Sequence, residues 1–365
     1  MFEFDAPVTT LGNPLKEVLS SSNLEQSEFS LPVVIGRERT GENYSYDLVQ
    51  IHSLLIAGKS APENDVFKLA LLSLLKGSSV SNLRMVLIDA KRKTLTEFDQ
   101  VPHLLTPVIT RPDHAMNALN WCLNEAFKRR QVMDALKVRD IEAYNRKVIA
   151  ENADLQPLPY IVMGVRELAE LSPDLRDLMI SQTARISRAT GIHLIVATKW
   201  LSEEVITEKL KAYMPSRIVL QTASPQASKF IFDVDDVEKV GWENLLFLPS
   251  GKMKPLELLP TSVMSTEVIE VLNSIQIEGK SPDYVPAVIA PPPEPQPYYQ
   301  EMTSYFESVV EFIFAHKQVS FIMLQRELRT GFNKTHRILD QMQEVGVVIA
   351  EPSENETYYR LNGGC

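Results

Sequence analysis

Residues 54–75 read LLIAGKSAPENDVFKLALLSLL, and this stretch decides the fold of the larger part of the chain. The apolar run at 54–57 predicts a buried strand, and residues 66–75 have the apolar spacing of a helix. The motif GKS stands between them at 58–60. Strand, GKS and helix is the order in which nucleotide-binding proteins hold a triphosphate. The stretch therefore poses the question whether this chain binds ATP.

Similar apolar runs recur along the chain and alternate with segments of helical spacing. They predict strands at 85–88, 160–165, 193–197, 218–220 and 245–248, and helices at 66–75, 116–136 and 174–189. Apolar runs without alternation are typical of parallel strands that are buried on both faces. We therefore expect an α/β domain in which helices cover a parallel sheet.

Composition divides the chain into four parts. Residues 1–30 are polar and predict an N-terminal arm with a short helix at 14–20. Residues 31–277 form the predicted α/β domain. Residues 278–300 contain APPPEPQP, which favours polyproline II and predicts a semi-rigid linker. Residues 301–365 predict three helices followed by a β-hairpin, which is the pattern of a winged helix-turn-helix domain.

Bulk properties exclude several classes of protein. A formal net charge of −10 argues against a chain that coats nucleic acid non-specifically. The two cysteines, Cys122 and Cys365, and six scattered histidines predict neither a disulfide framework nor a metal site. We find no pattern of a transmembrane span or signal peptide, and we therefore expect a cytoplasmic protein without membrane contact.

Collinear stretches of the chain resemble one family. They are HSLLIAG, LIDAKRKTLTEFDQVPHLLTPVIT, PYIVMGVRELAEL, RATGIHLIVAT, MPSRI and, near the C-terminus, TGFNKTHRILDQMQEVGVV. Together they resemble the FtsK/SpoIIIE-type DNA translocases, ring-shaped RecA-like motors of bacterial chromosome segregation and cell division. The resemblance covers about residues 31–361. It implies a RecA-like, P-loop-type sheet covered by helices and a winged-helix module that reads DNA.

The predicted nucleotide loop departs from the family's pattern. A working loop reads GxxxxGK[ST], and its backbone N–H groups wrap the β-phosphate. Here the five residues before Gly58 are SLLIA, which the strand requires, so Lys59 and Ser60 follow the strand directly. Ser60 and Glu63 fit a capping box, and Asp65 adds a second carboxylate. A triphosphate would meet like charge there, although residual nucleotide binding remains the alternative to an ordinary capped helix.

The resemblance implies further departures at three positions. Family motors end the strand PYIVVLVDE with an Asp that organises Mg²⁺ and a Glu that polarises the attacking water. This chain has PYIVMGV followed by Arg166 and Glu167. A guanidinium cannot ligate a cation or be deprotonated at any relevant pH. Lys199 stands at the position of the family's polar sensor, and Lys229 at that of its trans-acting Arg.

Loss of the cradle together with the metal carboxylate removes both nucleotide binding and stabilisation of phosphoryl transfer. We therefore predict a degenerate nucleotide site with no catalytic residue and with neither ATP nor Mg²⁺ as cofactor. We also hypothesise that Arg166 forms a salt bridge with Glu63 or Asp65 across the site. Such a pair would explain why the fold persists without a ligand.

The C-terminal part carries a candidate DNA-binding surface. Its polar residues at the predicted recognition helix and the turn before it are Arg326, Arg329, Asn333, Lys334, Arg337 and Asp340. Arg suits the edge of guanine, Asn that of adenine, and a carboxylate the amino group of cytosine. Asp340 stands where the family has a Glu, so the base preference is open. Apolar spacing assigns to the core Ile322, Leu324, Leu328, Ile338, Leu339 and Met342.

Three functions remain open at the level of sequence. The first is a non-catalytic, FtsK-like protein that binds double-stranded DNA or regulates a partner, such as an intact translocase, a recombinase or a division protein. The second is an active DNA translocase with unorthodox nucleotide loops. The third is a protein-binding adaptor without DNA contact, which fits the nine acidic and six basic residues of 301–365. The oligomeric state is not predicted.

Overall fold

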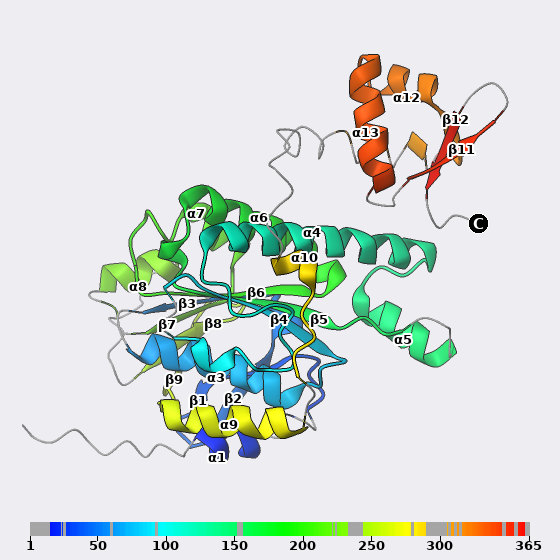
Figure 1. Cartoon of the computed structure of the whole chain (residues 1–365). Coiled ribbons are helices and arrows are strands. Elements are labelled where there is room, and N and C mark those ends of the chain that lie inside the picture. The colour runs from blue at the N-terminus through cyan, green and yellow to red at the C-terminus, as the bar shows by residue number, and fades with distance from the viewer. Residues whose placement is uncertain are drawn as a thin grey trace, which may run out of the picture. The chain divides into compact units, whose positions relative to one another are not determined.

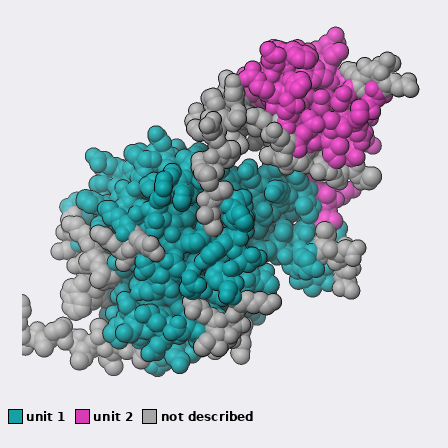
Figure 2. All heavy atoms as spheres, in the orientation of Figure 1, with its two compact units in different colours: residues 1–133, 138–291 teal, residues 134–137, 292–365 magenta. Residues whose placement is uncertain are grey.

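The computed structural model divides the chain into two compact units, residues 1–133 with 138–291 and residues 134–137 with 292–365 (Figure 2). The residues that it describes are 15–22, 24, 27–58, 61–91, 94–151, 156–220, 222, 225–232, 244–278, 281–289, 305, 308–309, 312–313, 316–344, 348–353 and 357–361. The three boundaries expected from composition stay predictions.

Part of the predicted linker packs against the first unit. The Arg84 guanidinium donates to the carbonyl of Asp283 at 2.7 Å, and the Tyr284 hydroxyl donates to the carbonyl of Asp99 at 2.7 Å. The side chain of Val288 is buried in the core of this unit. Residues 283–288 therefore pack with the α/β unit.

A seven-stranded sheet forms the centre of the first unit (Figure 1). Its order is β4-β5-β6-β3-β7-β8-β9. The strands are β3 Ser53–Gly58, β4 Leu83–Asp89, β5 Tyr160–Arg166, β6 Ile192–Thr198, β7 Arg217–Leu220, β8 Leu245–Leu248 and β9 Leu256–Leu258. The first five strands in this order are parallel to one another. β8 pairs antiparallel with β7, and β9 pairs antiparallel with β8. The expected α/β fold is confirmed, and its sheet is mixed because an apolar run specifies burial but not strand direction.

Helices cover both faces of the sheet. Figure 1 shows α4, α6 and α7 on one face and α3 on the other, with α9 and α1 against the outer side of α3. The helices are α1 Leu15–Ser21, α2 Leu48–Ile51, α3 Ala61–Gly77, α4 Pro112–Ala135, α5 Ile141–Glu151, α6 Pro173–Thr190, α7 Glu208–Tyr213, α8 Pro225–Phe232, α9 Ser265–Glu278 and α10 Pro286–Ile289, with 3-10 turns η2 Thr96–Phe98 and η3 Leu168–Glu170. Within the described ranges, no helix has the length and apolarity needed to cross a bilayer.

A hairpin of two strands, which the sequence analysis did not predict, packs beside α3. It consists of β1 Pro32–Arg37 and β2 Asn43–Asp47. The carboxylate of Asp47 caps the following turn, because it accepts from the backbone N–H groups of Leu31 and Val49 at 3.1 and 3.0 Å. This cap fixes the entry into β3, the strand that leads to the GKS motif.

A tight turn connects α6 to β6 and fixes where β6 begins, and therefore where its polar carboxyl end lies. The hydroxyl of Ser172 caps the start of α6, and Gly191 ends the helix with φ of 70°. A Cβ at Gly191 would lie 2.6 Å from Ile141 Cδ1, so this left-handed turn has no space for a side chain. β6 then begins at once, and all of its seven residues are buried.

The second unit contains a helix pair and a small sheet. Its described elements are β10 Val319–Ser320, α12 Phe321–Glu327, α13 Phe332–Glu344, β11 Val348–Pro352 and β12 Thr357–Leu361, and the strand order is β10-β12-β11. These elements confirm the last two predicted helices and the hairpin. The first predicted helix, 305–316, falls mostly outside the described residues.

Packing within the second unit agrees with five of the six predicted core positions. The buried side chains are those of Leu324, Leu328, Ile338, Leu339 and Met342. The prediction for Ile322 is wrong, because its side chain is 53% exposed. It lies in the first turn of α12, where apolar spacing does not distinguish a core-facing position from a solvent-facing one.

Candidate functional site

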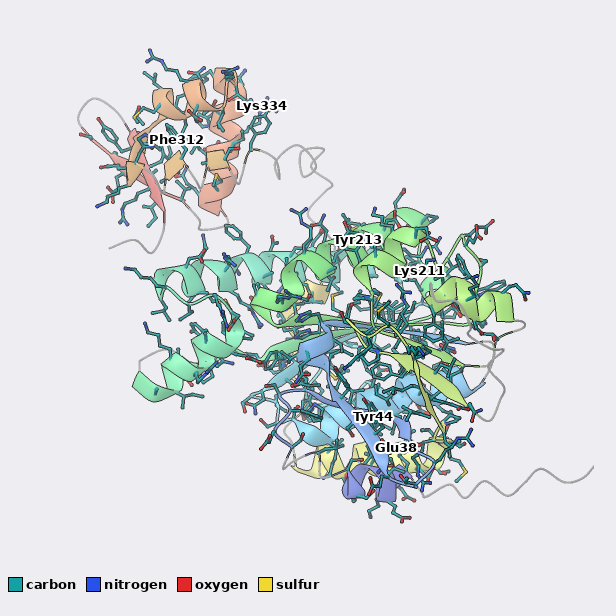
Figure 3. All side chains as sticks on the ribbon, turned by 180° about the vertical axis from the view of Figure 1, so that it is seen from behind. Glu38, Tyr44, Lys211, Tyr213, Phe312 and Lys334 are labelled. Atoms are coloured by element: carbon teal, nitrogen blue, oxygen red, sulfur yellow. The ribbon has the colours of Figure 1, made fainter. Side chains whose placement is uncertain are left out.

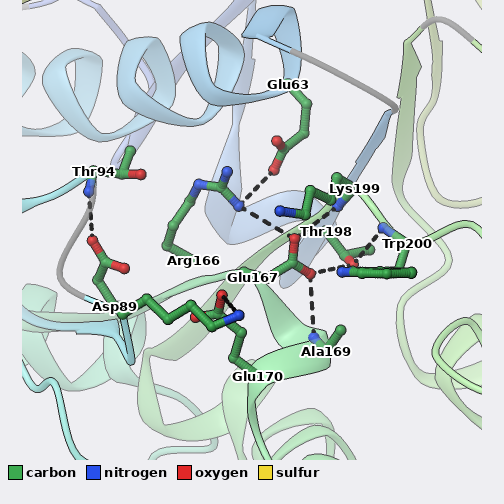
Figure 4. A network of polar contacts seen from close by, with 11 residues as sticks. Glu63, Asp89, Thr94, Arg166, Glu167, Ala169, Glu170, Thr198, Lys199 and Trp200 are labelled. Atoms are coloured by element: carbon green, nitrogen blue, oxygen red, sulfur yellow. Dashed lines mark hydrogen bonds and ion pairs between the residues drawn. The ribbon is translucent and has the colours of Figure 1, made fainter.

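The carboxyl ends of three neighbouring strands meet at the degenerate nucleotide motifs. β5, β6 and β3 are adjacent and parallel, so their ends lie at one edge of the sheet. The register pairs Arg166 with Ala197 and Ala57 with Thr198. This edge is where open α/β sheets bind ligands, and Figure 4 shows the polar network that occupies it.

A buried ion pair forms the centre of this network. The Nη1 atom of Arg166 lies 3.2 Å from Oε1 of Glu63, and the two residues are only 7% and 1% exposed. Among the described residues, neither atom has a hydrogen-bond partner, so the attraction between them is chiefly Coulombic. Burial raises the pKa of Glu63 to about 7, although the charge of Arg166 opposes the rise. The hypothesis that Arg166 pairs with an acid of the α3 start is confirmed for Glu63.

Asp65 does not take part in this pair. Its carboxylate accepts hydrogen bonds from the backbone of Val263 and the hydroxyl of Ser262. Burial raises its pKa, and these hydrogen bonds and the charge of Lys68 oppose the rise. Asp65 thus ties α3 to the segment before α9, whereas Glu63 points toward the strand ends.

The connection between β3 and α3 is very short. β3 ends at Gly58 and α3 begins at Ala61, so that only Lys59 and Ser60, which lie outside the described residues, separate them. A Cβ at Gly58 would lie 2.8 Å from the carbonyl oxygen of Leu220. The predicted capping box of Ser60 stays a prediction. A two-residue connection is shorter than the loop that wraps a phosphate in the motif GxxxxGK[ST].

Glu167 is held on the other side of Arg166. Its Oε1 atom accepts from the Thr198 hydroxyl at 2.8 Å and from the Ala169 N–H at 3.3 Å, and its Oε2 atom accepts from the Lys199 N–H at 3.3 Å. The backbone of Glu167 has φ of 63° and ψ of 81°, which is uncommon for a residue with a side chain. These bonds fix the carboxylate that the resemblance associates with activation of water.

Two further polar contacts at this edge were missed by the sequence reasoning. Asp89 ends β4, and its Oδ2 atom accepts from the N–H groups of Thr94 and Leu95 at 2.7 and 3.0 Å. Lys91 Nζ lies 2.9 Å from Glu170 Oε1. A polar residue at the end of an apolar strand was the signal that could have identified Asp89.

The remaining predicted residues of this site are exposed. The side chain of Lys199 extends from the end of β6, and its charge lowers the pKa of Glu63, although burial dominates. Lys229 is exposed on α8. The structure therefore brings together the residues from β5, β6 and α3, whereas Lys229 belongs to a different helix, α8.

In the second unit, three of the predicted DNA-reading residues share one face of α13. Thr335, Ile338, Leu339 and Met342 point into the core, so the opposite face carries Asn333, His336, Arg337 and Asp340. Arg337 Nε donates to the carbonyl of Asn333 at 3.1 Å. Lys334, labelled in Figure 3, places its Nζ atom 4.5 Å from the ring centroid of Tyr305. Arg326 and Arg329 are exposed at and just after the end of α12.

An exposed aromatic group and an acid–imidazole pair accompany these residues. The ring of Phe332, 61% exposed, lies 4.9 Å from that of Phe321 and 5.9 Å from that of His336. His336 Nδ1 donates to Asp340 Oδ2 at 2.6 Å. The sequence reasoning missed His336, because a polar side chain on a helix surface gives no sign that it is paired.

The comparisons with known proteins fit this two-part arrangement of an α/β unit and a winged-helix unit. The sequence profile of the FtsK/SpoIIIE family matches residues 14–205, and that of the Ftsk gamma domain matches residues 300–356. The chain belongs to the FtsK/SpoIIIE family. The DNA translocase FtsK of Haemophilus influenzae is 32% identical over 375 residues, which cover 94% of this chain and 70% of that protein.

Other relatives are longer than this chain. The DNA translocase FtsK of Borreliella burgdorferi is 34% identical over 351 residues, which cover 92% of this chain but 43% of that protein. The cytoplasmic domain of the type VII secretion ATPase EccC of Thermomonospora curvata superposes with a TM-score of 0.60, at 19% identity over 78% of this chain and 36% of that one. The pCW3 conjugation coupling protein TcpA has a TM-score of 0.54, at 22% identity over 69% and 72%. These two structures show the fold alone.

Proposed function

We propose that this chain is a non-catalytic member of its family, a pseudo-ATPase that acts by binding double-stranded DNA, a partner protein or both. The observation that carries the proposal is the buried pair of Arg166 and Glu63 at the strand ends, where the family resemblance places the metal and the phosphates. The proposed setting is cytoplasmic, in chromosome segregation or a related process of DNA translocation. Proposed partners are an intact FtsK-type translocase, a recombinase or a division protein.

The chemistry of these side chains does not fit Mg²⁺ and a triphosphate. A guanidinium has five N–H donors and no lone pair for a metal, and it stays protonated. Glu63 lies at the start of α3, whose N–H groups and dipole would otherwise attract an anion. An ionised Glu63 repels a phosphate at this place, and a protonated one still fills the space. No step of phosphoryl transfer is therefore assigned to these residues.

The second unit supports the DNA-binding part of the proposal. Its polar face on α13 combines Asn333 and Arg337, the residue types that read adenine and guanine in the major groove. Lys334 and the exposed Arg326 and Arg329 provide cations for phosphates. Since residues 301–365 contain nine acids and six bases, binding rests on this local face rather than on total charge.

Calorimetric titration of the full chain with Mg·ATP tests the non-catalytic assignment. We expect no saturable binding at millimolar nucleotide and no phosphate release with or without duplex DNA. Micromolar affinity together with DNA-stimulated hydrolysis would refute it and would favour an active translocase. A mobility shift on duplex DNA over a salt series tests DNA binding, which should weaken steeply with salt. A chain that retains no duplex at low salt would instead be a protein-binding adaptor.

A further inference from the structure

The face of α13 that would meet DNA contains a polar pair that restricts what its acid can do. His336 and Asp340 are one helical turn apart, and their side chains are 55% and 50% exposed. The imidazole Nδ1 lies 2.6 Å from Asp340 Oδ2. A carboxylate can only accept, so Nδ1 carries the hydrogen of this bond. The bond engages one carboxylate oxygen and leaves Oδ1 on the other side of the group.

The imidazole is itself held by aromatic neighbours. Its ring lies 5.9 Å from that of Phe332 and 6.3 Å from that of Phe321, at inclined angles of 46° and 59°. Phe332 precedes Asn333 in the first turn of α13, and Phe321 begins α12. The ring of His336 is therefore packed from the α12 side while it bonds Asp340 along α13. A side chain restrained at both ends can orient its partner, whereas an isolated Asp on a helix samples several rotamers.

We propose that His336 is a positioning residue for base recognition: it fixes the carboxylate of Asp340 so that Oδ1 accepts a hydrogen bond from the amino group of cytosine. This inference rests on the proposed DNA-binding function of α13. Asn333, Arg337 and Asp340 recur at helical spacing, so they face one stretch of groove together. A carboxylate that accepts from the cytosine N4 amino group is a known form of direct readout.

The pair also lowers the electrostatic obstacle to placing an acid beside DNA. An unpaired carboxylate is repelled by the phosphates, whereas the donated hydrogen from His336 draws charge away from Asp340. The shorter Asp side chain reaches less far than a Glu, so correct orientation matters more for contact with a base. Both effects require the imidazole donor and not merely an aromatic ring at position 336.

The test measures base preference of the full chain and not affinity alone. The duplexes that wild type and each variant prefer are first selected from a randomised duplex library. Their affinities for two duplexes that differ by one C·G pair at the preferred position are then compared. We expect His336→Ala and Asp340→Ala each to reduce the wild-type preference by about fivefold or more, since a good base contact gives about five- to hundredfold discrimination. His336→Asn should restore most of it, because the Asn side-chain N–H lies close to the place of Nδ1.

A double variant and a matched control make the outcome specific. If His336 acts through Asp340, the variant that combines both Ala substitutions loses no more preference than Asp340→Ala alone. The control His316→Ala removes another exposed histidine of this unit. Its Nδ1 bonds the Phe312 carbonyl, and its ring lies 4.3 Å from that of Phe312 at an angle of 39°. This substitution should leave the preference unchanged.

Each other result overturns the inference. A His336→Ala variant that loses thermal stability but keeps the full cytosine preference would mean that the pair only stabilises the helix. Additive losses in the double variant would mean that the two residues act independently. If wild type binds no duplex DNA at all, the proposed DNA function fails and this inference fails with it. Duplex binding with an unchanged preference in His336→Ala refutes the inference alone.

Discussion

The substitution Glu63→Gln tests whether burial governs the central ion pair of the first unit. Glu63 is 1% exposed, and burial raises its pKa from 4.5 to about 7 although Arg166 lies 3.2 Å away. Glutamine keeps the shape of the neutral acid and cannot ionise. The variant therefore separates the cost of burying the charge from the packing of the side chain.

The sign and size of the effect follow from proton linkage. The native state holds the Glu63 proton more tightly than the unfolded chain, so the stability contributed by the protonated form is full below pH 4.5 and is lost as the pH rises through 7. At about 1.4 kcal/mol per tenfold change in proton affinity, the whole loss is roughly 3 kcal/mol. We expect the advantage of Glu63→Gln over wild type to grow by about 1 kcal/mol between pH 6 and pH 8. This range lies above the sequence pI of 5.3.

Tryptophan fluorescence during denaturant unfolding is the suitable assay. The three tryptophans are Trp121, Trp200 and Trp242, all within 1–291, so the signal reports the first unit alone. This avoids a mixed transition of two units. The buried His193, whose pKa burial lowers to about 4, titrates in both proteins and cancels in the difference. A difference that is constant with pH, or a variant that is less stable by about 3–5 kcal/mol at pH 8, would refute the reasoning.

Three further predictions concern charged side chains of the two units. Arg166→Asp places a third carboxylate beside Glu63 and Glu167. We expect it to lower the unfolding free energy of the first unit by at least about 3 kcal/mol at pH 8. An unfolding free energy that stays unchanged, as followed by tryptophan fluorescence, would exclude the pair. Arg337→Ala should weaken binding to the preferred duplex by about 1–3 kcal/mol and relax preference for guanine, whereas Lys334→Ala should weaken binding to all sequences alike and reduce the salt slope by about one. Equal losses on every duplex for Arg337→Ala would assign it to phosphate contact only.

Burial explains why most of the first unit could be predicted from sequence. The runs at 54–57 and 160–165 are uninterrupted because their strands lie inside the sheet with helices on both sides, and such runs are hard to mistake. The hairpin of β1 and β2 was not predicted. The sequence NYSYD of β2 is half-buried and polar, so it has neither the apolar run of a central strand nor a clear alternation.

The pairing of Arg166 with Glu63 could be predicted because topology alone brings the residues together. Arg166 stands at the end of an apolar strand, and Glu63 lies in the first turn of the helix that follows another strand of the same sheet. Both strands end at the same edge of the sheet, and opposite charges that are buried at one edge must pair. The choice of Glu63 over Asp65 could not be predicted. It depends on which side of the first turn of α3 faces the strands, and residues two apart on a helix point in different directions.

The second unit shows the limit of spacing rules more sharply. Ile322 and Leu324 both fit an apolar helix pattern, yet only Leu324 is buried, because α12 is seven residues long and presents few positions for the pattern to average over. The pair of His336 and Asp340 has the spacing of any solvated helix face. The direction of the two side chains, rather than their residue type, makes this pair a candidate for base recognition.

The buried pair has a consequence for how the chain can work. A ligand drives a conformational cycle only if it binds two states with different free energies. In a nucleotide motor the triphosphate supplies that difference, and its hydrolysis removes it. Here the strand ends are bridged by Arg166 and Glu63, which are always present, so under the proposed function nothing at this edge changes with nucleotide. The first unit then acts as a fixed scaffold, and selectivity must come from what the second unit binds.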